Sequence, residues 1–214
     1  MKKIIVLLAF LFALNACSLK QIPENTTAAS YNVQLGLGYL AQNERVRAKE
    51  KLLRALNQAP NTLAPHLALA YYYETVDEQA KAQYTYQHAL KILPKSGQVN
   101  NNYGVFLCAQ GDYSQALVYF ERALLDPYYT NTASAYENTA LCMAKMNNAK
   151  AANYAYLAVQ QDPKRSGLFF KLSYLLAEQG ETQQALAYLD EYHQLNAPTQ
   201  ASMALVRKLI GDDA

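Results

Sequence analysis

The stretch NNYGVFLCAQGDYSQALVYFERALLDP, residues 101–127, carries the pattern that decides the fold. Its apolar residues recur every three or four positions, which predicts two amphipathic helices separated by Gly111-Asp112. The small residue Gly104 lies in the first helix, and Ala116 follows twelve residues later in the second. Pro127 ends the second helix, because proline lacks an N–H and its ring clashes with the preceding turn. The stretch therefore predicts a helical hairpin whose members cross closely at small residues.

The same arrangement returns in four other segments, so the chain carries five copies. Each copy has a small residue followed twelve positions later by an alanine: Gly36 and Ala48, Ala70 and Ala82, Gly104 and Ala116, Ala140 and Ala152, Ser173 and Ala185. Four positions beyond each alanine stands a large apolar residue, namely Leu52, Tyr86, Phe120, Tyr156 or Leu189. The copies close at Pro60, Pro94, Pro127, Pro163 and Pro198. A spacing of 33 to 36 residues between the alanines indicates a stacked repeat array.

This spacing is similar to that of the tetratricopeptide repeat, a pair of antiparallel helices. The resemblance implies an all-α, right-handed solenoid in which the paired helices cross at the small residues. The tryptophan usual in the first helix is absent from every copy, and its places are taken by Asn32, His66, Asn100, Tyr136 and Phe169. Gly111, Gly180 and Asn147-Asn148 are expected to end first helices. The amphipathic segment from Thr199 to Ile210 is expected to cap the open end of the stack.

The amino terminus has the layout of a signal peptide. Lys2 and Lys3 precede eleven apolar residues, which as a helix would span about 16 Å and fall short of the ~30 Å hydrocarbon core of a bilayer. The tetrapeptide Leu14-Asn15-Ala16-Cys17 resembles a bacterial lipobox, which implies that Cys17 is acylated and becomes the first residue. Ser18, not being aspartate, implies passage to the outer membrane in Gram-negative lipoproteins. The alternative is an ordinary cleaved signal followed by an incidental cysteine.

The sequence therefore predicts four regions. Residues 1–16 form the lipoprotein signal peptide and residues 17–28 the lipidated tether. Residues 29–198 form five tetratricopeptide repeats, and residues 199–214 form the C-terminal capping helix and tail. The expected location is the outer membrane, with the repeats in the periplasm.

The composition excludes several classes of protein. Apolar residues make up 51% of the 214, which is enough to bury a core and rules out a wholly disordered chain. The formal net charge of +2 falls to zero without the two lysines of the signal peptide, so a nucleic-acid-binding surface is not expected. Three cysteines, eight glycines and no tryptophan do not indicate a disulfide-rich or collagen-like protein.

The first helices of such a stack line a concave face, and the residues on this face follow from their offset to the small residue. The predicted partner-binding residues are Val33, Leu37, Leu40, Leu67, Tyr71, Asn101, Asn102 and Asn138. The apolar start of the groove favours an amphipathic helix or a hydrophobic strand of a partner, and the Asn102 and Asn138 amides could pair with an extended backbone. A carboxylate-binding groove is not expected, because Val33, Leu37 and Ala68 occupy the positions of its basic and amide residues. The alternative is that Val33, Leu37 and Leu40 only pack on neighbouring residues.

Cys108 and Cys142 lie in the first helices of neighbouring repeats, which run in the same direction. A disulfide between them would close a loop of about 34 residues and contribute roughly 3 to 4 kcal/mol. Two buried free thiols are the alternative. Metal binding is not expected, because no histidine lies at ligand spacing from either cysteine.

Catalysis is not expected from this sequence. His66, His88 and His193 fall in different repeats and form no metal-binding motif. No nucleophile and base can be paired, and Asp126-Pro127 and Asp162-Pro163 recur at the same repeat boundary as helix-end residues. We therefore expect no cofactor, no metal and no small-molecule substrate.

Residues 101–113, together with Ala135 to Cys142, are more specific than the general repeat pattern. They resemble the type IV pilus biogenesis and stability lipoproteins, the secretin pilotins with tetratricopeptide repeats. The resemblance implies an outer-membrane lipoprotein that helps the pilus secretin to reach that membrane and to multimerise. It also implies a structural role for the two repeat cysteines.

Other functions remain open at the level of the sequence. One is a tetratricopeptide lipoprotein of another envelope machine, such as outer-membrane barrel assembly or a tight-adherence pilus. Another is an activator of a periplasmic enzyme that builds or cuts the cell wall.

Overall fold

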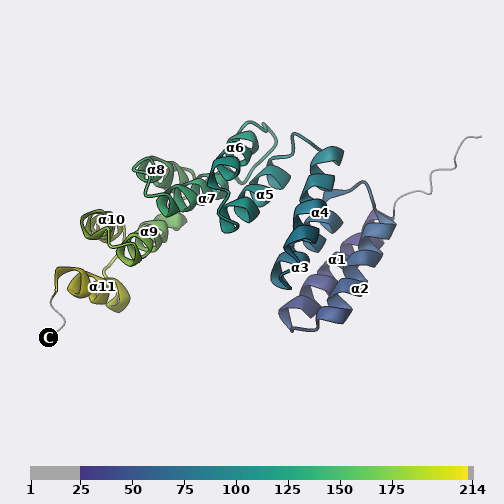
Figure 1. Cartoon of the computed structure of the whole chain (residues 1–214), viewed down its shortest axis with the longest axis horizontal. Coiled ribbons are helices and arrows are strands. Elements are labelled where there is room, and N and C mark those ends of the chain that lie inside the picture. The colour runs from purple at the N-terminus through teal and green to yellow at the C-terminus, as the bar shows by residue number, and fades with distance from the viewer. Residues whose placement is uncertain (1–24, 212–214) are drawn as a thin grey trace, which may run out of the picture.

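The computed structural model describes residues 25–211, so the predicted signal peptide, Cys17 with most of its tether, and the last three residues lie outside the described part. The helices are α1 Thr26–Ala41, α2 Arg45–Gln58, α3 Leu63–Thr75, α4 Gln79–Ile92, α5 Gly97–Ala109, α6 Tyr113–Leu124, α7 Thr132–Lys145, α8 Ala151–Gln161, η1 Pro163–Ser166, α9 Gly167–Glu178, α10 Thr182–Leu195 and α11 Gln200–Ile210. No strand occurs among these residues. The expected all-α fold is confirmed, and the helix pairs follow one another along an arch (Figure 1).

The helices pack as five consecutive pairs, from α1 with α2 to α9 with α10. Successive first helices, α1, α3, α5, α7 and α9, also contact one another, whereas successive second helices do not make comparable contacts. The stack must therefore curve with the first helices on its inner side. α11 packs on α9 and α10, as expected of a capping helix.

The small residues lie where the paired helices cross. Ala48, Ala82, Ala116 and Ala185 are fully buried. A methyl group built on Gly104 would come within 2.7 Å of the Phe120 ring, so that crossing leaves no room for a side chain. The twelve-residue frame predicted from the sequence is confirmed in repeats one, two, three and five.

In the fourth repeat the predicted register of the second helix is wrong by one residue. Ala151, Ala155 and Ala158 are buried there, while Ala152 is only half-buried and Tyr156 is exposed. α8 begins only at Ala151, four positions after the left-handed Asn147, whereas the other second helices begin two positions after their left-handed residue. The later start of α8 accompanies a buried face that is displaced by one position.

The first helices end in left-handed residues seven positions after each small residue. These are Asn43, Asp77, Gly111, Asn147 and Gly180, with φ between 55° and 83°. Gly111, Gly180 and Asn147 were expected from the sequence. Asn43 and Asp77 take this left-handed position in repeats one and two, because their short polar side chains tolerate the conformation.

The stack begins slightly earlier than predicted. α1 starts at Thr26, inside the segment expected to be tether, because the Asn25 side chain accepts a hydrogen bond from the Ala28 N–H and caps the helix. The Asn25 N–H also donates to the Gln58 carbonyl at the end of α2. At the other end, Thr199 and Ser202 form a capping box on α11.

The buried core consists of two main clusters. One runs through repeats one to three, and the other through repeats four and five. Cys142 belongs to the first cluster, although Ala140, Met143 and Ala144 of the same helix, α7, belong to the second. The seam between the two clusters therefore runs through α7, the first helix of the fourth repeat. Within residues 25–211, none of the helices is both long and apolar enough to cross a membrane.

Candidate partner-binding groove

An apolar stripe runs along the inner side of the arch. It consists of the residue one position after each small residue of the first helices: Leu37, Tyr71, Val105, Leu141 and Tyr174. Tyr71 is 55% exposed and Tyr174 is 51% exposed, while Leu37 and Leu141 are half-buried. Because the first helices stack on one another, these side chains form one surface across all five repeats, here called the concave stripe.

The structure places the predicted apolar binding residues at different depths. Leu40 and Leu67 are each only 8% exposed and belong to the core. Val33 and Leu37 are half-buried and pack against that core, and Tyr71 is exposed. Leu40 and Leu67 are therefore not available to a partner, because α1 and α3 pack against each other and enclose them.

The predicted asparagines pair with one another. The Asn138 Nδ2 donates to the Asn101 Oδ1 at 3.0 Å, and the Asn101 Nδ2 donates to the Asn102 Oδ1 at 3.3 Å. Asn101 is buried, so its amide links α5 to α7 and is not free for a peptide backbone. Asn102 is half-buried and lines a polar pocket of about 370 Å³ with Gln98 and Asn131.

An apolar hollow of about 300 Å³ interrupts the concave stripe between the third and fifth repeats. Its walls are Val105, Ala109, Leu141 and Leu175, with Asn138 and Lys145 also lining it. The sequence placed the apolar part of the groove nearer the amino terminus. The offset from the small residue places Val105 and Leu141 on the concave face from the sequence alone, whereas Leu175 lies one position beyond that offset and was not predicted.

A disulfide between Cys108 and Cys142 lines the same hollow. It joins α5 to α7, with 5.9 Å between the two Cα atoms. Both cysteines belong to the first core cluster, and Cys142 lies on α7, through which the seam between the two clusters runs. The bond therefore fixes the relative position of the two repeats that form most of the hollow.

An ion-pair cluster borders the groove in the fourth and fifth repeats. The Glu137 side chain, 14% exposed, accepts hydrogen bonds from Arg165 and, at 2.9 Å, from the Lys171 Nζ. Burial alone would raise the pKa of Glu137, but the bonds from Lys171 and Arg165 outweigh it and hold the pKa below its usual value. The cluster connects α7, η1 and α9.

A second carboxyl group lies at the end of α3. The Tyr86 hydroxyl donates to the Glu74 Oε1 at 2.6 Å. Burial raises the pKa of Glu74, and the bond from Tyr86 opposes that rise only in part. The pair ties the first helix of repeat two to its second helix.

The histidines are used in packing. His66 is buried, its ring stacks on His88 with 5.0 Å between centroids, and its Nε2 lies 2.7 Å from the Pro60 carbonyl oxygen. Burial lowers the pKa of His66. The Nε2 of His193 lies 2.8 Å from the Ser202 hydroxyl oxygen. Among the described residues, no group of three or more His, Cys, Asp or Glu side chains is placed to hold a metal ion.

The fold and the groove define a tetratricopeptide-repeat protein. The tetratricopeptide-repeat family pattern matches residues 85–118. The solved structure of YrrB, a tetratricopeptide-repeat protein, is 20% identical and superposes with a TM-score of 0.58 over 86% of this chain and 94% of YrrB, which shows the fold alone. Proteins of this fold are generally scaffolds without enzymatic activity.

More specific relatives show the family. The chain is 30% identical over 174 residues to the type IV pilus assembly protein PilF of Pseudomonas aeruginosa, covering 81% of this chain and 69% of PilF. The P. aeruginosa PilF structure has a TM-score of 0.70 and 29% identity, covering 87% of this chain and 84% of PilF. That of PilW, a widely conserved type IV pilus biogenesis factor, has a TM-score of 0.73 and 27% identity, covering 86% and 87%. An uncharacterized protein of Haemophilus influenzae is 37% identical over 137 residues, 64% of this chain and 76% of that protein. The chain belongs to the PilF family of tetratricopeptide-repeat proteins.

Proposed function

We propose that this protein is a non-enzymatic outer-membrane lipoprotein of type IV pilus biogenesis, which assists the pilus secretin in reaching that membrane and multimerising. The family membership supports a role in pilus biogenesis, since PilF and PilW are named for pilus assembly and biogenesis. The lipobox-like Leu14-Asn15-Ala16-Cys17 supports the anchor. The disulfide suits an oxidising compartment such as the periplasm.

The observation that carries the proposal is the concave stripe with its hollow. Tyr71, Val105 and Tyr174 offer exposed apolar surface on α3, α5 and α9, and α7 adds the half-buried Leu141 between the last two. An apolar segment of the secretin would bury this surface, at about 25 cal/mol per Å² of apolar area, less the cost of ordering the segment. No covalent chemistry is required for such a role.

The groove is tested by placing charges on the concave stripe. The variant Tyr71→Glu/Val105→Glu/Tyr174→Glu should abolish heat-resistant secretin multimers on a gel, because binding would then require burying carboxylates. The matched control is Tyr84→Glu/Val118→Glu/Tyr156→Glu, which puts three charges on exposed residues of the second helices. The control should leave the multimers unchanged. Circular dichroism shows whether the groove variant is folded. Normal secretin multimers with a folded groove variant would contradict secretin binding by the concave stripe.

The anchor is tested separately at Cys17. Cys17→Ala should prevent incorporation of labelled fatty acid and leave the secretin outside the outer membrane, while the purified repeats still bind the secretin. Acylation or outer-membrane location that persists in this variant would contradict the lipoprotein assignment.

A further inference from the structure

The two edges of the solenoid differ in character. Antiparallel helix pairs place every connection between repeats on one edge and every connection within a repeat on the other. The inter-repeat edge consists of residues 59–62, 93–96, 125–131, 162–166 and 196–199, and the intra-repeat edge of residues 42–44, 76–78, 110–112, 146–150 and 179–181. Neighbouring connections touch on the inter-repeat edge, where the Gly97 N–H donates to the Asp126 Oδ2 at 2.6 Å and the Ser166 hydroxyl to the Asn196 Oδ1 at 2.8 Å.

The charges of the two edges have opposite sign. The inter-repeat edge carries Lys95, Lys164 and Arg165 against Asp126 and Asp162. The intra-repeat edge carries Glu44, Asp77, Glu78, Asp112 and Glu181 against Lys150. Both carboxylates of the inter-repeat edge already accept hydrogen bonds from nearby backbone N–H groups. Arg165 is already paired with Glu137 and Asp162, so Lys95 and Lys164 are the cations that the described part of this edge offers to its surroundings.

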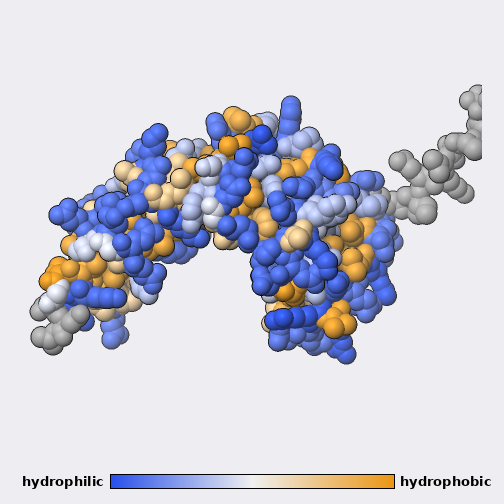
Figure 2. Space-filling view, in the orientation of Figure 1, coloured by the Kyte–Doolittle hydropathy of each residue, from blue (hydrophilic) through white to orange (hydrophobic). Residues whose placement is uncertain are grey.

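The central part of the inter-repeat edge also exposes large apolar side chains. Leu125 is 75% exposed and Tyr128 is 89% exposed, and Leu93 on the preceding connection is exposed as well. Figure 2 shows hydrophobic surface at the crest of the arch, over α6. Exposed apolar and tyrosine side chains next to cations are the composition of segments that rest at a membrane interface.

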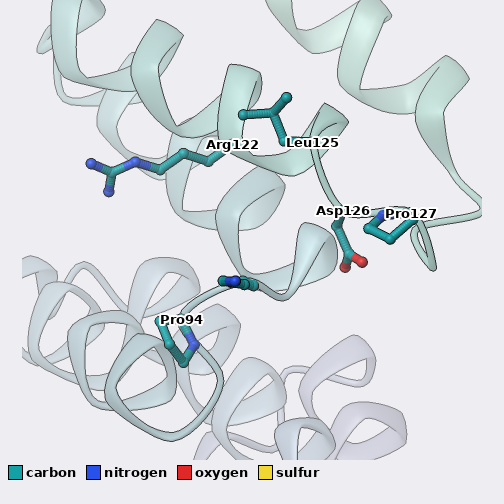
Figure 3. A pocket seen from close by; sticks show the side chains of 6 residues that line it. Pro94, Arg122, Leu125, Asp126 and Pro127 are labelled. Carbon is teal, nitrogen blue, oxygen red and sulfur yellow. The ribbon is translucent and has the colours of Figure 1, made fainter.

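A pocket of about 500 Å³ lies between these two connections. Figure 3 shows Arg122, Leu125 and Pro127 from the end of α6 on one side and Pro94 on the other. Lys95 and Asp126 complete its lining, and the Asp126 carboxylate is already bonded to the backbone N–H groups of Gly97 and Tyr128. In the described part of the chain, neither Lys95 nor Arg122 forms an ion pair with a carboxylate, so both can meet an external anion.

The point at which the chain enters the stack lies on this same edge. The Asn25 N–H is bonded to the Gln58 carbonyl, beside the connection from α2 to α3. Eight residues, 17–24, separate this point from the proposed acyl anchor, and they can span at most about 26 to 29 Å. An anchor on Cys17 would therefore hold the inter-repeat edge near the bilayer.

We propose that the inter-repeat edge around Leu125 and Tyr128 rests on an anionic phospholipid surface. Leu93, Leu125 and Tyr128 enter the headgroup region, and Lys95 and Arg122 face the lipid phosphates. The inference rests on the proposed lipid anchor. This contact would fix the orientation of the protein on the membrane. The concave stripe would then face sideways, parallel to the membrane surface.

The chain contains no tryptophan, so one introduced tryptophan is an unambiguous reporter. The full-length acylated protein carrying Tyr128→Trp is reconstituted in vesicles of phosphatidylethanolamine and phosphatidylglycerol. Its emission should shift to the blue and be quenched by brominated lipids. The matched control is Val46→Trp, since Val46 is 84% exposed beside the intra-repeat edge. Its emission should stay at the wavelength of a hydrated indole and resist quenching.

The charge contribution is tested in the Tyr128→Trp background. Adding Lys95→Glu and Arg122→Glu should reduce the quenching, and so should phosphatidylcholine vesicles or added salt. Lys150→Glu, on the other edge, should leave the quenching unchanged. A protein that floats with the vesicles while both reporters stay unquenched, or are quenched equally, overturns the inference alone. A protein that does not float contradicts the anchor and the inference with it.

Discussion

Gly36 of α1 lies directly against Leu52 of α2. A methyl group on Gly36 would come within 2.6 Å of the Leu52 side chain and 3.2 Å of the Ala48 carbonyl oxygen. Leu52 is fully buried, so it cannot move aside. An alanine at position 36 would therefore overpack the first crossing of the stack.

We expect Gly36→Ala to destabilise the protein by about 1 to 3 kcal/mol, because the added methyl group overpacks a filled crossing. The measurement is the free energy of unfolding in urea. Gly38→Ala is the matched control two residues away in the same helix, where an added methyl group meets no atom within 4 Å. It should stabilise by about 0.5 to 1 kcal/mol through helix propensity. Equal effects of the two changes would contradict the close crossing.

The disulfide should stabilise the seam between the core clusters. We expect Cys108→Ala/Cys142→Ala to lower the free energy of unfolding by about 3 to 4 kcal/mol, the value for a loop of this length. Repeats one to three should then unfold at a different temperature from repeats four and five, since stability in repeat arrays depends on contacts between neighbouring repeats. Calorimetry of the oxidised protein, the reduced protein and the variant measures both effects. A single unchanged transition in all three would show that the bond does not couple the clusters.

The Glu137 ion-pair cluster should make stability depend on pH. The pKa of Glu137 is lowered in the folded protein, so its contribution is present above the unfolded value of about 4.3 and is lost as the pH falls through the folded value. Glu137→Gln should lower stability at neutral pH by about 1.5 to 3 kcal/mol, the range for hydrogen bonds to charged groups, and flatten the profile below about pH 4.3. Unfolding in urea at a series of pH values tests this.

Lys171→Met is a useful comparison for that experiment. The Lys171 side chain is 61% exposed, so its loss should cost no more than about 1 kcal/mol at neutral pH. A larger effect for Lys171→Met than for Glu137→Gln would mean that the buried carboxylate is not the centre of the cluster.

The amide pair between α5 and α7 should be detectable as a coupling energy. In a double-mutant cycle of Asn101→Ala and Asn138→Ala, the two changes should be non-additive by about 0.5 to 1.5 kcal/mol, because each single change removes the same hydrogen bond. Additive losses would indicate that the two amides act independently.

The sequence predicted the helix pairs because burial along a helix repeats every three or four residues and close crossings require small residues. It did not predict the register of α8. Ala151 and Ala152 are adjacent alanines, and the point at which α8 begins depends on local hydrogen bonds at Asn148. Alanine-rich helices leave such choices open, since either register offers a small residue.

The groove was harder to predict than the fold. Leu40, Leu67 and Tyr71 lie at positions that face the inner side of the arch, but only Tyr71 is exposed. Whether such a residue is covered depends on how closely successive first helices approach, which no single repeat encodes. The pairing of Cys108 with Cys142 depends on the same approach, so the sequence left the bond and the free thiols as alternatives.

The bond between Cys108 and Cys142 also limits how far the chain can lengthen under tension. The 34-residue span that it closes would reach roughly 110 to 120 Å if drawn straight. A molecule pulled apart at its two ends would stay shorter by that amount. Its middle would keep its length while the outer repeats unravelled, so the two halves of the arch would remain together under load.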